Sequence, residues 1–206
     1  MGMAEGYDVL RLIEHGRSCH VSSEYVKGTP LIRWLKYHPN LSKEQIIVWV
    51  QGMAQTLECI HRCRGGPCYK YLNPYTVIIT EDRKLYFLDM NTESNHKTLL
   101  RVQRRDVREN FLPPGEDYYQ TESISLDLYS LGKTIQYLLA FTEPEPPFTR
   151  REEIRFQRII SRCIQKKSKR AYAGMSELRK QISVIDVKGR DKKENRSNGN
   201  RKTKWK

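Results

Sequence analysis

Residues 68–79, CYKYLNPYTVII, join a polar turn to an apolar strand. Threonine, valine and isoleucine fill the end of the segment, and such β-branched residues favour strands. In a turn of this form an enzyme would keep an acid, a base or a metal ligand, but this chain carries Tyr71, Asn73 and Thr76 there. The segment therefore has the form of a catalytic loop without a carboxylate or a cation at these three positions.

Upstream of this segment, the hydrophobic pattern predicts two strands followed by two helices. The strands are expected at 7–16 and 18–26, with a turn at 16–17, and the helices at 30–38 and 43–63. The longer helix should open with a capping box, because Ser42 precedes Gln45 by three residues. Its apolar side chains recur every three or four residues, and the Gly-Gly-Pro run at 65–67 should end it.

Downstream, the pattern predicts one hairpin, a long loop and three more helices. The hairpin strands are expected at 76–80 and 84–89, and the helices at 125–141, 151–165 and 175–185. Between the hairpin and these helices, residues 90–121 are polar and show no clear periodicity. We expect a loop there, and loops of this length inside a compact domain are usually functional or disordered.

The composition indicates one folded domain followed by a basic tail. The chain has 206 residues, of which 38% are hydrophobic, and this is enough for one core. Residues 186–206 hold nine Lys and Arg against three Asp and Glu, about half of the net charge of +13. With almost nothing apolar to bury, this end should be a disordered tail after a domain at 1–185. The tail would either keep the protein soluble or contact an anionic membrane surface or nucleic acid.

The sequence also predicts where the protein resides. No apolar run approaches the length that a bilayer-spanning helix needs, and the first ten residues lack the charged and apolar regions of a signal peptide. We therefore expect a cytoplasmic protein, with any membrane association made through the basic tail.

The cysteine count favours reduced thiols, since an odd number without a secreted framework does not predict disulfides. The five cysteines are Cys19, Cys59, Cys63, Cys68 and Cys163. Together with His61, the three cysteines at 59–68 lie close enough in sequence to suggest zinc. However, no second ligand pair follows at a standard spacing, so buried or incidental thiols are the favoured interpretation.

The order of these elements, with five short motifs, resembles the protein kinase fold from about Tyr7 to Ile182. The motifs are SSEYVKGTPL at 22–31, similar to the interlobe hinge; residues 68–79, similar to the catalytic loop; LDMN at 88–91, similar to Asp-Phe-Gly; PPGE at 113–116, similar to Ala-Pro-Glu; and DLYSLG at 127–132, similar to the start of the central C-lobe helix. The resemblance implies an α+β fold with a mainly helical C-lobe at 28–185. Residues 1–27 would form a truncated, two-stranded N-lobe remnant and the hinge.

The resemblance also implies roles for single residues. Glu24 and Val26 would offer backbone groups to adenine, and Asp89 would be the carboxylate that binds Mg²⁺. Asp127 would accept hydrogen bonds from the loop backbone. Glu116 would pair with Arg170 and so tie the loop before the central helix to the last helices.

Three catalytic positions depart from the kinase pattern. Tyr71 stands at the carboxylate, Asn73 at the lysine and Thr76 at the metal-binding asparagine. Tyrosine, with an ordinary pKa near ~10, is a poor proton acceptor at neutral pH. Asparagine cannot neutralise phosphate charge, and threonine is a weak ligand for magnesium. The residues before the hinge, about 23 of them, leave no room for a glycine-rich loop, so no cofactor is expected, with ATP and Mg²⁺ as the alternative.

These features lead to one main hypothesis and two alternatives for function. The main hypothesis is a catalytically inactive kinase-like scaffold, a pseudokinase that binds a protein partner. One alternative is an atypical phosphotransferase whose missing elements come from another chain, and the other is a binder of anionic membrane or nucleic acid through the tail. We expect the loop tyrosines to fill the space that ATP would need rather than stack on bases, with Tyr71 first among them to be buried and hydrogen-bonded.

Overall fold

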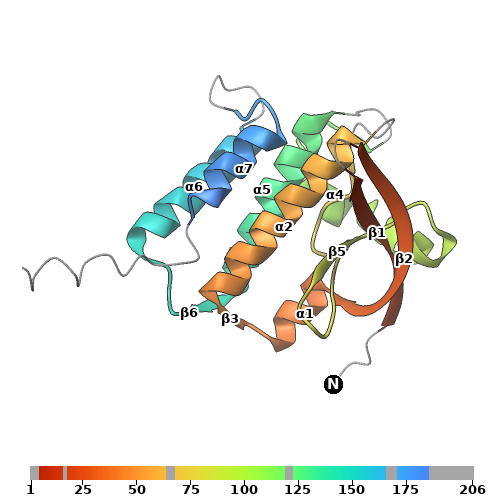
Figure 1. The fold of residues 1–206 in the computed structure, drawn as a ribbon, viewed down its shortest axis with the longest axis horizontal. Coiled ribbons are helices and arrows are strands. Elements are labelled where there is room, and N and C mark those ends of the chain that lie inside the picture. Colours follow the sequence, from red (N-terminus) through yellow and green to blue (C-terminus); the bar gives the residue numbers. More distant parts are fainter. Residues whose placement is uncertain (1–4, 16–17, 64–67, 119–122, 166–170, 186–206) are drawn as a thin grey trace, which may run out of the picture.

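The computed structural model describes residues 5–15, 18–63, 68–118, 123–165 and 171–185, which form an α+β arrangement (Figure 1). The strands are β1 Glu5–His15, β2 Ser18–Pro30, β3 Asn40–Ser42, β4 Val77–Ile79, β5 Leu85–Leu88 and β6 Glu143–Glu145. The helices are α1 Leu31–Tyr37, α2 Lys43–Arg62, α3 His96–Val102, α4 Arg105–Phe111, α5 Ile124–Ala140, α6 Arg150–Ile164 and α7 Met175–Ser183, with one 3-10 turn, η1 Glu93–Asn95.

Four strands close into a small barrel in the order β1, β2, β4, β5. β1 pairs with β2 along its whole length, from Glu5 opposite Gly28 to His15 opposite Ser18. β5 pairs with β1 and β4 pairs with the end of β2. A side chain at Gly28 would meet Ile78 Cγ2 at 2.5 Å, so glycine allows β2 to approach β4. The first two strands are thus joined to the later hairpin in one sheet.

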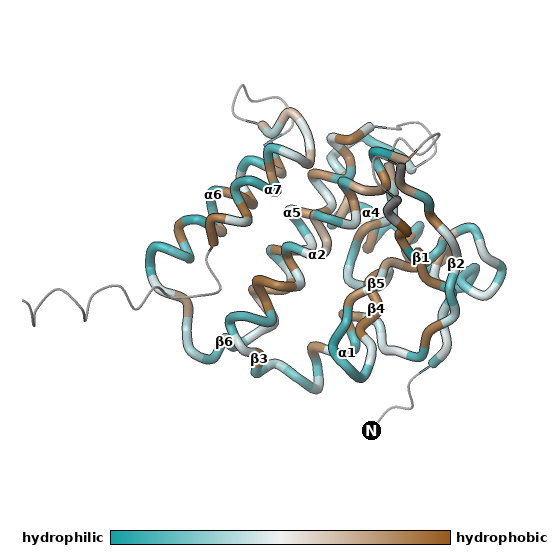
Figure 2. Tube along the Cα trace, viewed as in Figure 1, coloured by the Kyte–Doolittle hydropathy of each residue, from teal (hydrophilic) through white to brown (hydrophobic). Residues whose placement is uncertain are grey.

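Helix α2 lies between the barrel and the helices α5 and α7 (Figure 1). Its predicted apolar face is confirmed, because the residues on it are buried. They are Ile46, Val50, Met53, Leu57 and Ile60. Hydrophobic and hydrophilic segments alternate along the longer helices (Figure 2), the pattern expected of helices with one buried face.

Glycine also allows α5 and α6 to pack closely. A Cβ atom at Gly132 would lie 2.6 Å from the Cβ atom of Cys163, closer than atoms in van der Waals contact. Gly52 of α2 has no such neighbour within 4 Å. The two helical glycines therefore differ, since only Gly132 sits at a helix contact.

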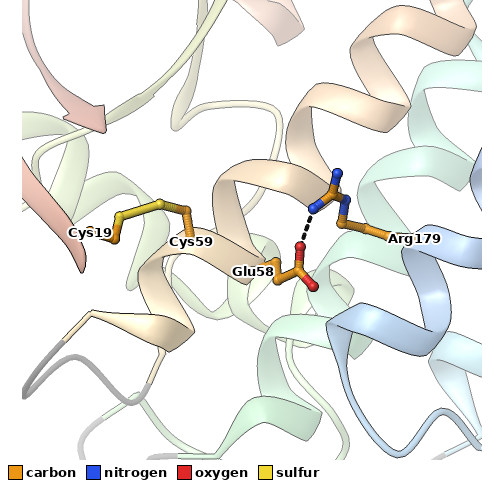
Figure 3. The surroundings of a disulfide bond; sticks show 4 residues. All are labelled: Cys19, Glu58, Cys59 and Arg179. Carbon is orange, nitrogen blue, oxygen red and sulfur yellow. Dashed lines mark hydrogen bonds and ion pairs between the residues drawn. A yellow bond between two sulfur atoms is a disulfide. The ribbon is translucent and has the colours of Figure 1, made fainter. Parts of the chain in front are cut away.

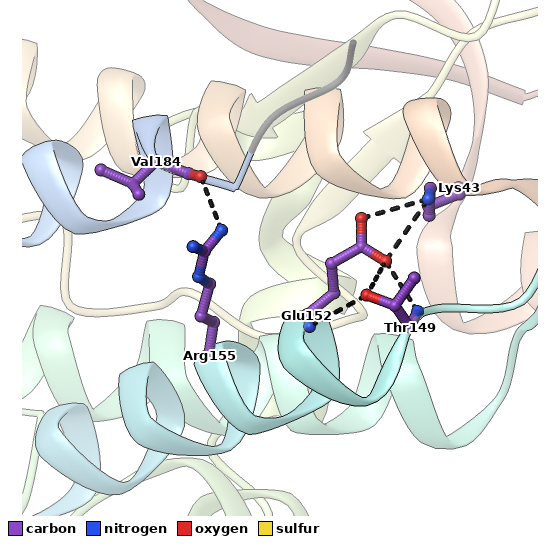
Figure 4. A network of polar contacts seen from close by, with 5 residues as sticks. All are labelled: Lys43, Thr149, Glu152, Arg155 and Val184. Atoms are coloured by element: carbon purple, nitrogen blue, oxygen red, sulfur yellow. Dashed lines mark hydrogen bonds and ion pairs between the residues drawn. The ribbon is translucent and has the colours of Figure 1, made fainter. Parts of the chain in front are cut away.

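The start of α6 is tied to the start of α2 by a polar network (Figure 4). Thr149 and Glu152 form a reciprocal capping box, and Glu152 also pairs with Lys43 of α2 at 3.1 Å. Burial by itself raises the pKa of Glu152, but the Thr149 backbone and hydroxyl donors and the Lys43 ammonium hold that pKa below its ordinary value. Arg155 donates to the carbonyl of Val184 at 3.0 Å and so fastens α6 to the end of α7.

Most predicted elements are confirmed, with shifts of a few residues at their ends, but the stretch 90–121 is not a long loop. It contains η1, α3 and α4. α3 and α4 are seven residues each, and they bury only Val102 in the first and Val107 and Phe111 in the second. A helix this short, with one or two core residues, leaves too few apolar positions for a visible periodicity.

The strands β3 and β6 were not predicted. They form a parallel pair between residues about 100 positions apart, from Asn40 opposite Glu143 to Ser42 opposite Glu145.

Three predictions fall on residues that the structure does not describe. The turn at 16–17, the helix end at 65–67 and the basic tail at 186–206 lie outside the described residues. Among the helices that are described, none is long and apolar enough to cross a membrane.

Candidate functional site

The segment 68–76 is held to helix α5 by one buried carboxylate. Asp127, which is 0% exposed, accepts hydrogen bonds from the backbone N–H groups of Tyr69 at 2.7 Å and Lys70 at 2.8 Å. It also accepts from His61 Nε2 of α2 at 2.8 Å. Lys70 has a φ of 71°, a left-handed conformation that is uncommon outside glycine. The strained turn thus coincides with the point at which two successive residues donate to Asp127, the contact that the sequence analysis expects.

The side chains at two of the three departing positions are used to brace the loop itself. Asn73 donates from Nδ2 to the carbonyl of Tyr71 at 2.8 Å, and its Oδ1 accepts from the N–H of Tyr75, also at 2.8 Å. The Thr76 hydroxyl lies 2.7 Å from the same Tyr71 carbonyl and accepts from the N–H of Asn73 at 3.1 Å. Asn73 and Thr76 are both 0% exposed. Their polar atoms therefore face the loop backbone, where a metal ion or phosphate would have to displace these bonds.

Among the loop tyrosines, Tyr69 is buried. Its hydroxyl donates to the carbonyl of Leu88 at 2.8 Å, and burial raises its pKa well above the ordinary value. The rings of Tyr69 and Phe87 lie 5.0 Å apart. Tyr71 is half-buried, and its ring lies 5.0 Å from that of Tyr118. Tyr69 is therefore the buried ring of the loop, whereas Tyr71, which was expected to be largely buried, is only half-buried.

Asp89 follows directly after β5 and is partly exposed. Its Oδ1 accepts from the N–H and side-chain amide of Asn91, at 3.1 and 3.2 Å. The carbonyl of Asp89 accepts from Asn95 Nδ2 at 2.8 Å, and Asn95 also donates to the carbonyl of Asp8 at 2.7 Å. The carboxylate thus caps a local turn, and the described contacts do not join it to Thr76, the partner that the resemblance assigns to it for magnesium.

The predicted hinge is a regular strand in the structure. Glu24 lies opposite Val9 and Val26 lies opposite Tyr7, both within the continuous strand β2. The side chain of Glu24 pairs at 3.1 Å with Arg11 on the surface. The expected boundary between residues 27 and 28 also falls inside β2, because the strand runs on to pair with β4. A contact of Glu24 and Val26 with adenine stays a prediction.

The motif at 113–116 forms a turn in which Gly115 has a φ of 81°, a conformation that favours glycine. Glu116 donates from its N–H to the carbonyl of Pro113 at 3.1 Å. Arg170, the partner expected for Glu116, lies outside the described residues, so this pair stays a prediction.

A disulfide bond joins Cys19, at the start of β2, to Cys59, in the last turn of α2 (Figure 3). The expectation of reduced thiols is therefore wrong for these two residues. Figure 3 also shows Glu58, which pairs with Arg179 of α7 on a different side of the same helix. Spacing along the chain could not reveal the disulfide, since its two cysteines are 40 residues apart.

Comparison with known proteins shows a similarity of low identity. No family model matches the chain. A probable serine/threonine-protein kinase of Clostridium acetobutylicum is 20% identical to it over an alignment 192 positions long, which covers 82% of this chain and 29% of that protein. The chain therefore spans less than a third of the length of this relative. The match indicates a kinase-like relationship over most of the chain.

Proposed function

We propose that this chain is a kinase-like domain that does not transfer phosphate and that serves as a scaffold for a protein partner. Its similarity to a probable serine/threonine kinase supports the kinase-like part of the proposal. The observation that carries the loss of chemistry is the loop itself, in which Asn73 and Thr76 are fully buried and bonded to the loop backbone.

Phosphoryl transfer needs groups that this loop does not offer at the expected positions. A carboxylate must orient the attacking hydroxyl, a cation must neutralise the phosphate, and a second ligand must hold Mg²⁺. Tyr71 instead packs its ring against Tyr118, Asn73 is neutral, and the Thr76 hydroxyl is already hydrogen-bonded. Asp89 is the one carboxylate left among the four positions. The loop contacts therefore support a structural role.

The scaffold part of the proposal is supported by an apolar groove beside the loop. The groove has a volume of about 530 Å³ and lies between the loop, α4 and α5. Tyr75, Phe111, Tyr137 and Phe141 contribute aromatic rings to its wall. Phe141 remains 53% exposed although it stacks on Tyr137 at 4.3 Å. Exposed aromatic surface of this kind is typical of protein-binding sites.

Phosphotransfer with radiolabelled ATP tests the proposal. The purified chain, with Mg²⁺ or Mn²⁺, should label neither itself nor generic protein substrates above the level of the Asp89→Asn variant. Robust labelling that this variant abolishes would overturn the proposal.

Replacing the tyrosine at the carboxylate position gives a second test. Tyr71→Asp should fail to restore transfer, and it should lower the free energy of unfolding by about 1–3 kcal/mol, because it puts a charge against the ring of Tyr118. Transfer gained by Tyr71→Asp would show that the remaining site is competent and would contradict the structural role of the loop.

The partly exposed carboxylate of Asp89 favours one second candidate, a nucleotide-binding domain completed by elements of another chain. MgATP at ~100 times its dissociation constant would stabilise the fold by ~2.7 kcal/mol. A thermal shift that Asp89→Asn removes would support this candidate, and no shift in the chain or in its partner complex would exclude it.

Binding to anionic vesicles or RNA through 186–206 is a separate hypothesis with its own test. Deletion of that segment should abolish the binding, and salt should weaken it.

A further inference from the structure

Three cysteine sulfur atoms converge where the first hairpin meets helix α2. Cys59 lies in the last turn of α2 and Cys63 is its C-cap, so four residues separate them and they share one face of the helix. Cys19, at the start of β2, approaches Cys59 from the side of the first hairpin (Figure 3). The three Sγ atoms all lie within 4.8 Å of one another. A helix and a strand therefore bring three cysteine sulfur atoms together, two of them joined in the disulfide and one a free thiol.

This convergence differs from the zinc site that spacing alone suggests. His61 is two residues from Cys59 and so points to another face of α2, where its Nε2 donates to Asp127. Cys19, which is distant in sequence, takes its place in the cluster. The ligand set is thus decided by packing, and it consists of sulfur alone.

The geometry suits a soft divalent cation. Zinc binds thiolates at ~2.3 Å in tetrahedral sites, which places the sulfur atoms ~3.8 Å apart. Once the Cys19–Cys59 bond is reduced, sulfur atoms that lie within 4.8 Å of one another are close enough to adopt that spacing by a change of side-chain rotamer. Cys59 is 1% exposed, whereas Cys19 and Cys63 are partly exposed. An ion can therefore enter from the side of these two, and a water molecule or another ligand can take the fourth position.

We propose that Cys19, Cys59 and Cys63 form a three-thiolate site for a divalent cation of the zinc class, open when the disulfide is reduced. Two equivalents of a small-molecule thiol reduce the Cys19–Cys59 bond, yielding two cysteine thiols and one disulfide of the reductant. With Cys63 this gives three thiols, which release three protons as they bind one Zn²⁺. The metal replaces the covalent link, so the hairpin stays fastened to α2 in the reduced protein.

Cobalt titration of the full chain tests the site. Reduced protein, freed of metal by a chelator, should bind one Co²⁺ per chain and develop a sulfur-to-cobalt charge-transfer band together with visible bands of tetrahedral cobalt. Zn²⁺ should displace the Co²⁺. Protein kept oxidised should show neither band, because two of the three ligands are joined to each other.

Variants separate this site from the other thiols. Cys63 is outside the disulfide, so Cys63→Ser removes a ligand without removing a cross-link, and it should weaken Co²⁺ binding by at least about 10- to 100-fold. Cys163→Ala, which removes the buried thiol on α6, should leave the binding unchanged, and circular dichroism of both variants checks folding. The proposal is overturned by folded, reduced protein without thiolate bands, by equal binding in Cys63→Ser, by binding to oxidised protein, or by one ion per two chains.

Discussion

Removing the carboxylate of Asp127 should be among the most damaging single changes in this protein. Asp127→Ala leaves three donors without their acceptor, namely the N–H groups of Tyr69 and Lys70 and the Nε2 of His61. Because Asp127 is 0% exposed, bulk water does not reach the vacated position. Hydrogen bonds to charged groups contribute ~1.5–3 kcal/mol each, but they are not additive within one network. We therefore expect a total loss of about 3–5 kcal/mol rather than the full sum of three such bonds.

Denaturant unfolding followed by circular dichroism measures this loss. Asp127→Asn keeps one side-chain oxygen that can accept from the N–H of Lys70. Its free energy of unfolding should therefore lie between those of the wild type and Asp127→Ala. Asp82→Ala is the matched control, because the Asp82 side chain is 55% exposed in the β4–β5 turn and pairs only with surface groups. Its denaturation midpoint should stay close to that of the wild type.

Amide exchange gives an independent measure of the same contact. In Asp127→Ala the N–H groups of Tyr69 and Lys70 should exchange faster than in the wild type, since each loses its acceptor. If Asp127→Ala costs less than about 1 kcal/mol, or if the exchange of these two amides is unchanged, the loop is not held by the carboxylate and the anchoring argument fails.

Three further predictions concern the packing and polar contacts around the site. Gly132→Ala should lower the free energy of unfolding by about 1–3 kcal/mol, because the new methyl group would meet α6. Gly52→Ala, with no neighbour within 4 Å, should raise it by about 0.5–1 kcal/mol. If denaturant unfolding shows changes of the same sign for both variants, the close contact at Gly132 is contradicted. Glu152→Gln should lower the free energy of unfolding most above pH 4.5. The lowered pKa of the Glu152 carboxyl adds stability that is lost as pH falls through its pKa in the folded protein. A difference between variant and wild type that does not change with pH would exclude this contribution. Without metal or reductant, Cys19→Ser should lower the free energy of unfolding by about 2–4 kcal/mol, the loss expected when a disulfide closing a 40-residue loop is removed. A reductant added to the wild type should cause the same loss. If neither change lowers the stability, the cross-link is contradicted.

The longer elements follow from the sequence because their determinants are local. Apolar residues at helical spacing predict α2, α5, α6 and α7, and the charged turn between two apolar runs predicts the hairpin of β4 and β5. The short helices α3 and α4 escape such reasoning, since few of their residues reach the core. The pairing of β3 with β6 escapes it as well, because nothing near Asn40 in sequence records the presence of Glu143.

For the candidate site, the sequence by itself determined which side chains are present. Tyr71, Asn73 and Thr76 exclude a carboxylate, a cation and a strong metal ligand at their positions whatever the fold. This exclusion follows from the chemistry of the three side chains alone.

Only the tertiary structure decided which partners these side chains meet. The backbone turn at Lys70 directs the ring of Tyr69 against β5, where its hydroxyl reaches Leu88. The packing of the first hairpin on α2 brings Cys19 to Cys59 across 40 residues of chain. Side-chain direction depends on backbone angles, and contacts between distant residues depend on how whole elements pack, so neither is written in the local pattern of residues.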